Sequence, residues 1–382
     1  MAAPKKKKSR ETWGQIDPLP SGRYRARYTH LEHRFTAPHT FDTLGDARDW
    51  LADQRRDISR GEWRDPRQVA STIFGVYAKK WVEQRRTSKG GALRPKTRSG
   101  YDQSLRVGLA AFTDTPIASI TPASVRSWHA ERAKKAATAA GADARLLRAI
   151  LNTAIEDGLI DDNPVAGNLC RSKTGKKHRP PTLDELAALL AAMPEKLRLA
   201  VVIAAYGSAR MSEWRGLRRM DMGIVPALGS SPAQPIIRIE RQVQWVDGYG
   251  WDIGPTKSEE GERNTFLPSA FASLVEYHLA NFVGPEPTAL LFEPEGAHEY
   301  LANHTWRKYW DHAREVVGVT DQMREHDLRR FAGTMHAQAG ATLRETMAFL
   351  GHSTTEAAMA YQATTGREAE LAERMPVPAS LR

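Results

Sequence analysis

The N-terminal part of the chain carries two short runs in which polar and apolar residues alternate. The first covers residues 23–28, directly after a turn signal at residues 20–22, and the second covers residues 32–41. A period of two places successive side chains on opposite faces of a strand, so the two runs predict paired strands of a small sheet. One face of the first run carries only arginine, namely Arg23, Arg25 and Arg27.

Helical spacing replaces this alternation after residue 42. Thr43 and Asp46 are spaced as a helix N-cap and its third residue, and apolar residues then recur every three to four positions. These apolar positions are Ala47, Trp50, Leu51 and Ile58. Residues 1–64 therefore predict a three-stranded sheet backed by one helix, with arginines on the outer face of the sheet.

Residues 70–170 show helical periodicity alone. One apolar stripe consists of Ile73, Phe74, Tyr77 and Trp81, and such a stripe is typical of a core rather than of a binding surface. Thr121 and Pro122 occupy the favoured N-cap and first positions of another helix. We expect an all-helical domain here.

A polar and basic stretch at residues 171–181 ends in two prolines and is typical of a linker. Thr182 and Glu185 then form a capping box that opens a third domain, residues 182–382. Within it, residues 199–206 predict a buried helix, and residues from about 236 to 267 predict a small antiparallel sheet. The fold class is therefore mainly α with small β-sheets (α+β).

Charge narrows the choice of partner. The 382 residues carry a formal net charge of +10, which favours a polyanion such as DNA. From residue 79 to residue 106 nine basic residues face two acidic ones, and phosphate contact is the natural interpretation of that surplus. The candidates for DNA contact, besides the three N-terminal arginines, are Lys79, Lys80, Arg94, Lys96 and Arg98. The single cysteine excludes a disulfide within the chain and fits a reducing cytoplasm.

A set of ionisable residues in the last 180 positions supplies what attack on a phosphodiester requires. The set is Arg210, Lys257, His326, Arg329, His352 and Tyr361. The transition state spreads negative charge over the non-bridging oxygens, so fixed cations and hydrogen-bond donors carry most of the catalysis. Two arginines offer permanently charged planar forks, and a histidine adds a third donor.

The remaining residues of the set supply nucleophile, base and acid. The phenol of Tyr361 has an ordinary pKa near 10 and must lose its proton during attack, for which His326 is the candidate base. Lys257 is the candidate general acid for the leaving 5′-hydroxyl. Glu213, three residues after Arg210, is expected to orient that arginine. Each residue alone is better explained as an ordinary ion pair or core side chain; the ordered set is not.

The order and spacing of these residues resemble the catalytic domain of the tyrosine recombinases, in the phage-integrase branch. The resemblance implies a 3′-phosphotyrosyl intermediate, no metal or other cofactor, no ATP, and a homotetramer on double-stranded DNA. It also implies an arm-type DNA-binding domain at residues 1–64 and a helical, SAM-like core-binding domain at residues 70–170. The chain departs from the pattern at Arg330, where many relatives carry a second histidine, and in the long gap before Lys257.

The expected function is thus site-specific integration or excision of phage-type DNA at core and arm attachment sites. A host DNA-bending factor and an excision accessory protein are expected partners by resemblance, with the bacterial cytoplasm and nucleoid as location and no membrane partner. A type IB topoisomerase-like enzyme would share the chemistry, and a catalytically silent DNA-binding relative would share the fold. The alternatives differ in covalent adduct formation and in the need for an arm-binding module.

Overall fold

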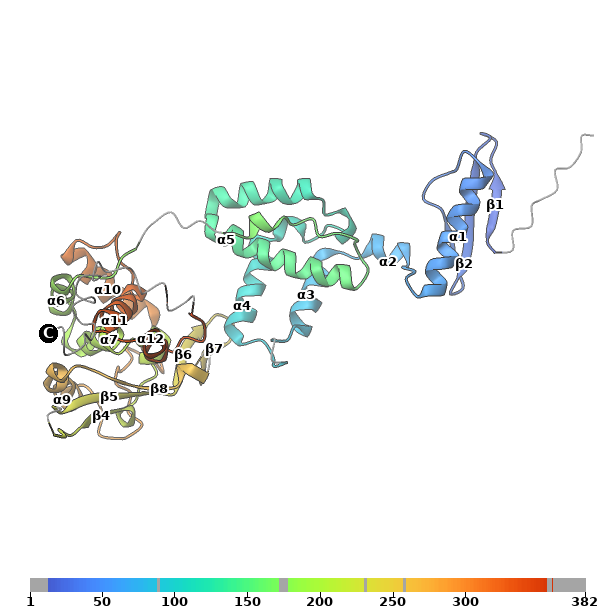
Figure 1. Cartoon of the computed structure of the whole chain (residues 1–382). Coiled ribbons are helices and arrows are strands. Elements are labelled where there is room, and N and C mark those ends of the chain that lie inside the picture. The colour runs from blue at the N-terminus through green and yellow to red at the C-terminus, as the bar shows by residue number, and fades with distance from the viewer. Residues whose placement is uncertain are drawn as a thin grey trace, which may run out of the picture. The chain divides into compact units, whose positions relative to one another are not determined.

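The computed structural model is mainly helical with small antiparallel sheets, as predicted (Figure 1). The chain divides into two compact units, Met1–Gln84 with Gln103–Ser172, and Arg85–Asp102 with Lys173–Arg382. The structure describes residues 13–87, 90–171, 178–229, 232–256, 259–355 and 359. The predicted domain boundaries stay a prediction.

The first unit begins with the predicted sheet and helix. Strands β1 (Gln15–Pro18), β2 (Tyr24–His30) and β3 (His33–Thr36) pair antiparallel in that order, and α1 (Leu44–Arg60) covers one face. Thr43 caps α1 by accepting a hydrogen bond from the backbone N–H of Asp46 at 3.1 Å. The apolar side of the alternating run is buried against Ala47 and Leu51, as expected from its period.

The rest of the first unit is helical. It contains the short helix α2 (Pro66–Ser71) and the longer helices α3 (Phe74–Gln84) and α5 (Pro122–Glu156). Thr121 makes the predicted cap, in both directions with Ser124, and α5 bends where Ala136 leaves helical geometry (φ −159°, ψ 81°).

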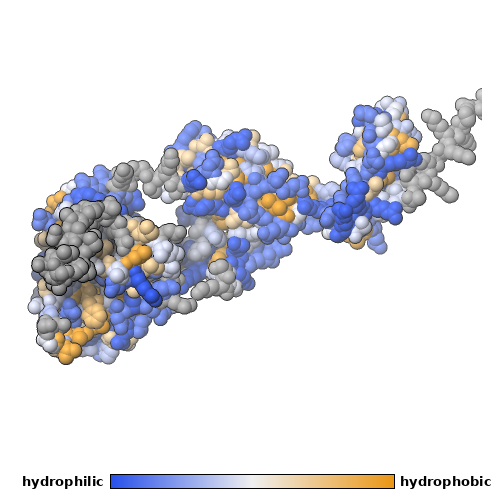
Figure 2. Space-filling view, viewed as in Figure 1, coloured by the Kyte–Doolittle hydropathy of each residue, from blue (hydrophilic) through white to orange (hydrophobic). Residues whose placement is uncertain are grey.

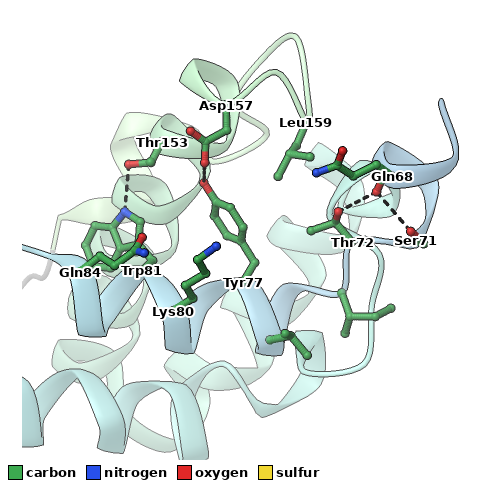
Figure 3. Close-up of a pocket in the computed structure, with 12 residues that line it drawn as sticks. Gln68, Ser71, Thr72, Tyr77, Lys80, Trp81, Gln84, Thr153, Asp157 and Leu159 are labelled. Atoms are coloured by element: carbon green, nitrogen blue, oxygen red, sulfur yellow. Dashed lines mark hydrogen bonds between the residues drawn. The ribbon is translucent and has the colours of Figure 1, made fainter. Parts of the chain in front are cut away.

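The predicted core stripe on α3 divides into two parts. Phe74 and Trp81 are buried and Tyr77 is half-buried, and both Tyr77 and Trp81 line a pocket of about 600 Å³ (Figure 3). The Tyr77 hydroxyl donates to Asp157 Oδ2 at 2.6 Å, and Trp81 Nε1 donates to Thr153 Oγ1 at 2.9 Å. Tyr77 packs with its ring half-buried and keeps its hydroxyl on a polar partner, as a tyrosine at the edge of a core does.

The second unit is built around α7 (Glu195–Tyr206), in which eight residues are buried. Helix α7 packs against α11 (His326–Gln338), and this contact places the turn after α7 beside the start of α11. The other helices of this unit are α4 (Pro95–Gln103), α6 (Leu183–Ala192), α8 (Met211–Trp214), α9 (Ala272–Asn281), α10 (Asn303–Val317) and α12 (Leu343–Leu350). The predicted capping box of Thr182 and Glu185 opens α6.

Two small sheets complete the second unit. Strands β4 (Met222–Val225), β5 (Gln234–Ile239) and β8 (Arg263–Phe266) form one sheet, and β6 (Arg241–Val246) pairs with β7 (Gly250–Pro255). The predicted sheet is present, but it begins earlier than expected, at Met222. The prediction missed strand β4 because four residues are too few to show a period.

The face drawn in Figure 2 is mostly hydrophilic, with apolar residues in scattered patches. Within the described ranges no helix combines the length and the apolar composition that crossing a bilayer requires.

Candidate active site

The turn between α7 and α8 positions Arg210. Ser208 has φ +54°, a left-handed conformation that is uncommon for a residue with a side chain. Its side chain is buried, and its hydroxyl donates to the carbonyl of Phe349 at 2.6 Å. Its own carbonyl accepts from Arg329 and, at 3.2 Å, from Arg263. The strained turn thus aims one carbonyl at two arginines and leads directly into Arg210.

Glu213 joins two arginines from different elements. Arg210 Nη1 lies 2.6 Å from Glu213 Oε1, and Arg263 Nη2 lies 3.1 Å from Glu213 Oε2. Burial alone raises the pKa of Glu213, but the charges of Arg263 and Arg210 outweigh it and hold the pKa below its ordinary value. The glutamate therefore stays ionised and fixes both guanidinium groups.

Arg329 lies beneath the site on the first turns of α11. The residue is 1 % exposed, and its guanidinium donates to the carbonyls of Ser208 and Leu350. These bonds tie α11 to the turn after α7 and to the end of α12. Arg330 points elsewhere: its Nη1 donates to the carbonyl of His178 at 2.8 Å and to Asp327 Oδ1 at 3.2 Å.

The end of α12 brings in His352. Gly351 caps α12 in the left-handed region (φ +57°), and a Cβ there would lie 2.8 Å from the carbonyl oxygen of Glu260. The Gly351 carbonyl accepts from Arg210 Nη2 at 3.3 Å. Only glycine combines this conformation with so close an approach, so the cap places the next residue, His352, among the arginines.

Both histidines of the site are kept neutral at neutral pH. Burial, followed by the positive charges of Arg329 and Arg210, lowers the pKa of His352 to about 4. Burial and Arg329 also lower the pKa of His326, whose side chain remains accessible to solvent. A neutral and accessible imidazole can accept a proton, and a neutral imidazole can still donate one hydrogen bond.

The structure thus brings Arg210, His326, Arg329 and His352 into one electrostatically coupled cluster. Lys257 and Tyr361 lie outside the described residues. The neighbouring strand ends are described: β7 ends at Pro255 and β8 begins at Arg263.

The sheet arginines lie on the face opposite the core of the first unit. Arg25 is exposed, Arg23 pairs with Asp42 at 2.6 Å, and Arg27 pairs with Asp17. The face carries positive charge, part of which is compensated locally.

The other candidates for DNA contact lie on two helices and the segment before one of them. Lys79 and Lys80 are exposed on α3, and Lys96 and Arg98 lie on α4. Arg94, just before α4, donates through Nη2 to the carbonyl of Thr256 at 2.9 Å, inside the second unit.

Two family models match the chain. "Phage integrase, N-terminal domain" matches residues 12–60, and "Phage integrase family" matches residues 235–367. The prophage phiRv2 integrase of Mycobacterium tuberculosis is 36 % identical over 376 residues, covering 96 % of each chain. The integrase of Mycobacterium phage D29 is 32 % identical over 382 residues, covering 96 % of this chain and 97 % of the relative.

The chain belongs to the phage integrase family. The predicted resemblance to phage-type tyrosine recombinases is confirmed, and with it the function of a DNA recombinase that integrates phage DNA. The matched ranges include the N-terminal sheet and helix and every predicted catalytic position except Arg210.

Solved integrases share the fold. The Tn1549 transposon integrase in complex with circular intermediate DNA aligns with a TM-score of 0.65 at 19 % identity, over 80 % of this chain and 99 % of that one. A lambda integrase dimer bound to a core site aligns with a TM-score of 0.54 at 16 % identity, over 97 % and 99 %. At these identities the likeness establishes the integrase fold.

Sequence reasoning missed Arg263 and Ser208. Arg263 stands at the start of a returning strand that the sequence did indicate, but its partner Glu213 is 50 residues away. Ser208 carries no signal of its left-handed backbone in its residue type. Of the two, only Arg263 could have been suspected, as a charged residue beside a strand of the catalytic region.

Proposed function

We propose that this integrase cleaves one DNA strand at a core site by attack of the Tyr361 hydroxyl on the scissile phosphorus. A bond forms between the phenolic oxygen and phosphorus, and the bond from phosphorus to the 5′-oxygen breaks. The product is a 3′-phosphotyrosyl ester and a free 5′-hydroxyl, which the reverse reaction on an exchanged strand rejoins. The observation that carries the proposal is the cluster of Arg210, Arg329, His326 and His352.

The two arginines have different roles because one is partly exposed and the other is buried. Arg210 has a side chain that is 26 % exposed and donates directly to a non-bridging oxygen, while buried Arg329 adds charge from below and holds the turn at Ser208. His352 supplies a further donor. Each such preorganised donor contributes about a hundred- to a thousandfold in rate.

Two residues transfer protons in the proposed reaction, one as a base and one as an acid. His326, neutral at pH 7 because its pKa is lowered, accepts the proton of Tyr361. Lys257 donates a proton to the leaving 5′-oxygen. Because the phosphotyrosyl ester keeps the bond energy for religation, the cycle needs neither ATP nor a metal ion.

We further propose that residues 1–64 bind arm sites and that the helical core-binding domain contacts phosphates of the core site. The solved lambda integrase tetramer is bound to a Holliday junction, and a homotetramer is proposed for this integrase too. A host DNA-bending factor and an excision accessory protein remain predictions, as does action at the nucleoid in the bacterial cytoplasm.

The test is a nicked core-site DNA, taken from the DNA flanking the gene, that traps covalent intermediates. Wild type in a chelator and without ATP should form an adduct at a 3′-phosphate, seen on a denaturing gel. Tyr361→Phe should bind the same DNA and form none. Tyr277→Phe, at a half-exposed tyrosine of α9, is the matched control and should react like wild type. Binding without an adduct in any of the three proteins would contradict the proposal.

A further inference from the structure

A second group of charged residues lies under the active site, and the mechanism above does not use it. Arg215, which directly follows α8, is only 2 % exposed. Its Nη2 atom donates to Asn303 Oδ1 at 2.5 Å and contacts Met211 Sδ at 2.7 Å. Its guanidinium also lies 5.8 Å from the ring centre of Trp251. A buried arginine held on several sides needs an anionic partner to offset the loss of hydration.

The carboxylate whose negative charge acts on Arg215 is that of Glu325, the residue immediately before His326. The charge of Arg215 and the indole N–H groups of Trp306 and Trp214 all act on the Glu325 carboxylate. Both tryptophans are buried, with ring centres 4.8 Å apart. In the part of the chain that the structure describes, neither indole Nε1 nor Arg215 Nε has a hydrogen-bond partner within normal distance. Glu325 and Trp306 line the same pocket, and Trp214, which is in ring contact with Trp306, is followed directly in the chain by Arg215.

Glu325 lies next to the active site because it directly precedes His326 in the chain. Glu325 has helical backbone angles (φ −50°, ψ −42°) at the N-cap of α11. Successive residues of a helix point about 100° apart, so fixing one side chain fixes the direction of the next. Glu325 is half-buried and lines a pocket together with Trp306, whereas the side chain of His326 is exposed.

We propose that Glu325 is a positioning residue for His326. The Glu325 carboxylate, attracted by the positive charge of Arg215 and by the indole N–H groups of Trp214 and Trp306, keeps the first turn of α11 in the orientation that catalysis needs. This inference rests on the proposed role of His326 as the base. Loss of the negative charge removes the attraction that holds the three donors, and the helix start loosens.

The charge on Glu325 changes in the physiological range. Burial raises its pKa to about 7, against the lowering effect of Arg215. Burial also lowers the pKa of Arg215 to about 10, so that residue stays charged at neutral pH. The pocket of about 370 Å³ that Glu325 lines is also lined by Arg307, Asp311 and Arg314 of α10 and by Arg324 and His326 near the start of α11. Asp327 follows His326 directly in the chain.

A pH profile separates this role from a merely structural one. As pH falls through about 7, Glu325 becomes neutral and the lock weakens. The pKa of His326 lies below its ordinary 6.5, so protonation of the base produces a second, more acidic limb. Wild-type cleavage should therefore decline in two steps, the first of which belongs to Glu325.

The experiment measures single-turnover adduct formation on the nicked core-site DNA at saturating enzyme from pH 5.5 to pH 9. Glu325→Gln keeps the side-chain shape but carries no charge. It should lower the rate at pH 8 by about 10- to 100-fold, as expected for a catalytic group displaced by about 1 Å, and it should lack the limb near pH 7. Asp311→Asn, at an exposed carboxylate of the same pocket, is the control and should reproduce the wild-type profile. A Glu325→Gln profile that superimposes on wild type would overturn the inference.

A second variant covers the case in which Glu325→Gln does not fold, as judged by thermal unfolding. Arg215→Lys keeps the positive charge but is too short and compact to keep the contact with Asn303. With the charge further from Glu325, the limb near pH 7 should move to higher pH, and an unmoved limb would overturn the inference. Failure of the proposed function looks different, because wild type itself would then form no adduct.

Discussion

The candidate catalytic pocket and the N-terminal sheet both present arginines, but the arginines are held in different ways. In the pocket, the side chains of Arg263 and Glu213 are 6 % and 1 % exposed, and their partners come from four separate elements. On the sheet, Arg23 and its partner Asp42 are 44 % and 76 % exposed. Arg25 lies in the open beside them.

This difference separates catalysis from docking. Buried charges with fixed partners are weakly screened and need no reorganisation when negative charge develops on a phosphate. Exposed charges are screened by salt and contribute little to stability, but they can exchange an intramolecular carboxylate for a DNA phosphate. We therefore propose that the pocket is organised before DNA arrives and that the arginines of the sheet change partners when they meet DNA.

The largest effect is expected from deleting the N-terminal sheet. Deleting residues 1–64 should abolish integration between attachment sites and leave cleavage of an isolated core site unchanged, because the pocket draws no residue from the sheet. Integration assays and adduct formation on the same preparation measure the two outcomes. Undiminished integration by the truncated protein would show that the sheet is not an arm-binding module.

The next largest effect is expected from removing the negative charge of Glu213 inside the pocket. Glu213→Gln leaves Arg263 and Arg210 without their shared counterion, which should reduce the free energy of unfolding by about 3–5 kcal/mol. Asp42→Asn breaks the exposed pair with Arg23 and should change it by less than about 1 kcal/mol. Chemical denaturation of both variants measures the contrast, and equal losses would refute the distinction between the two regions.

A third change tests direct contact with the phosphate. Arg210→Lys keeps the charge but loses the planar fork, and it should slow adduct formation by about a hundred- to a thousandfold while core-site binding changes little. Arg238→Lys, at an exposed arginine of β5, is the control. If both variants cleaved at the wild-type rate, Arg210 would have to act on structure alone.

The smallest effect concerns pH. The pKa of His352 is about 4 in the folded protein against an ordinary value of 6.5, so the unfolded chain binds a proton that the folded chain rejects. Stability should therefore fall as pH falls from about 6.5 to about 4, by less than the pKa difference alone implies, because solvent screens the partly exposed imidazole. Denaturation of DNA-free wild type and His352→Gln across this window isolates the contribution, which should be absent in the variant.

Local patterns in the sequence were enough to predict the N-terminal module and the helix starts. The alternation in residues 23–28 fixed which arginines face outward, and Thr43, Thr121 and Thr182 each cap a helix as expected. These features depend on neighbours within four residues.

Features that depend on distant partners were beyond the sequence. Arg263 gains its place from Glu213, and the left-handed turn at Ser208 is held by Arg329 and by the carbonyl of Phe349, more than 120 residues away. The hydroxyl of Tyr77 likewise donates a hydrogen bond to Asp157, 80 residues further on. Such contacts cannot be predicted from residue type and spacing, because they form only when the fold brings distant segments together.

The most direct test of the central claim is to identify the residue that becomes joined to DNA. The trapped adduct would be digested with trypsin and nuclease and analysed by mass spectrometry. Residues 345–367 form a single tryptic peptide with one tyrosine, Tyr361. We expect this peptide to carry a nucleotide attached through its 3′-phosphate. An adduct on any other peptide, or attachment through a 5′-phosphate, would contradict the proposed chemistry.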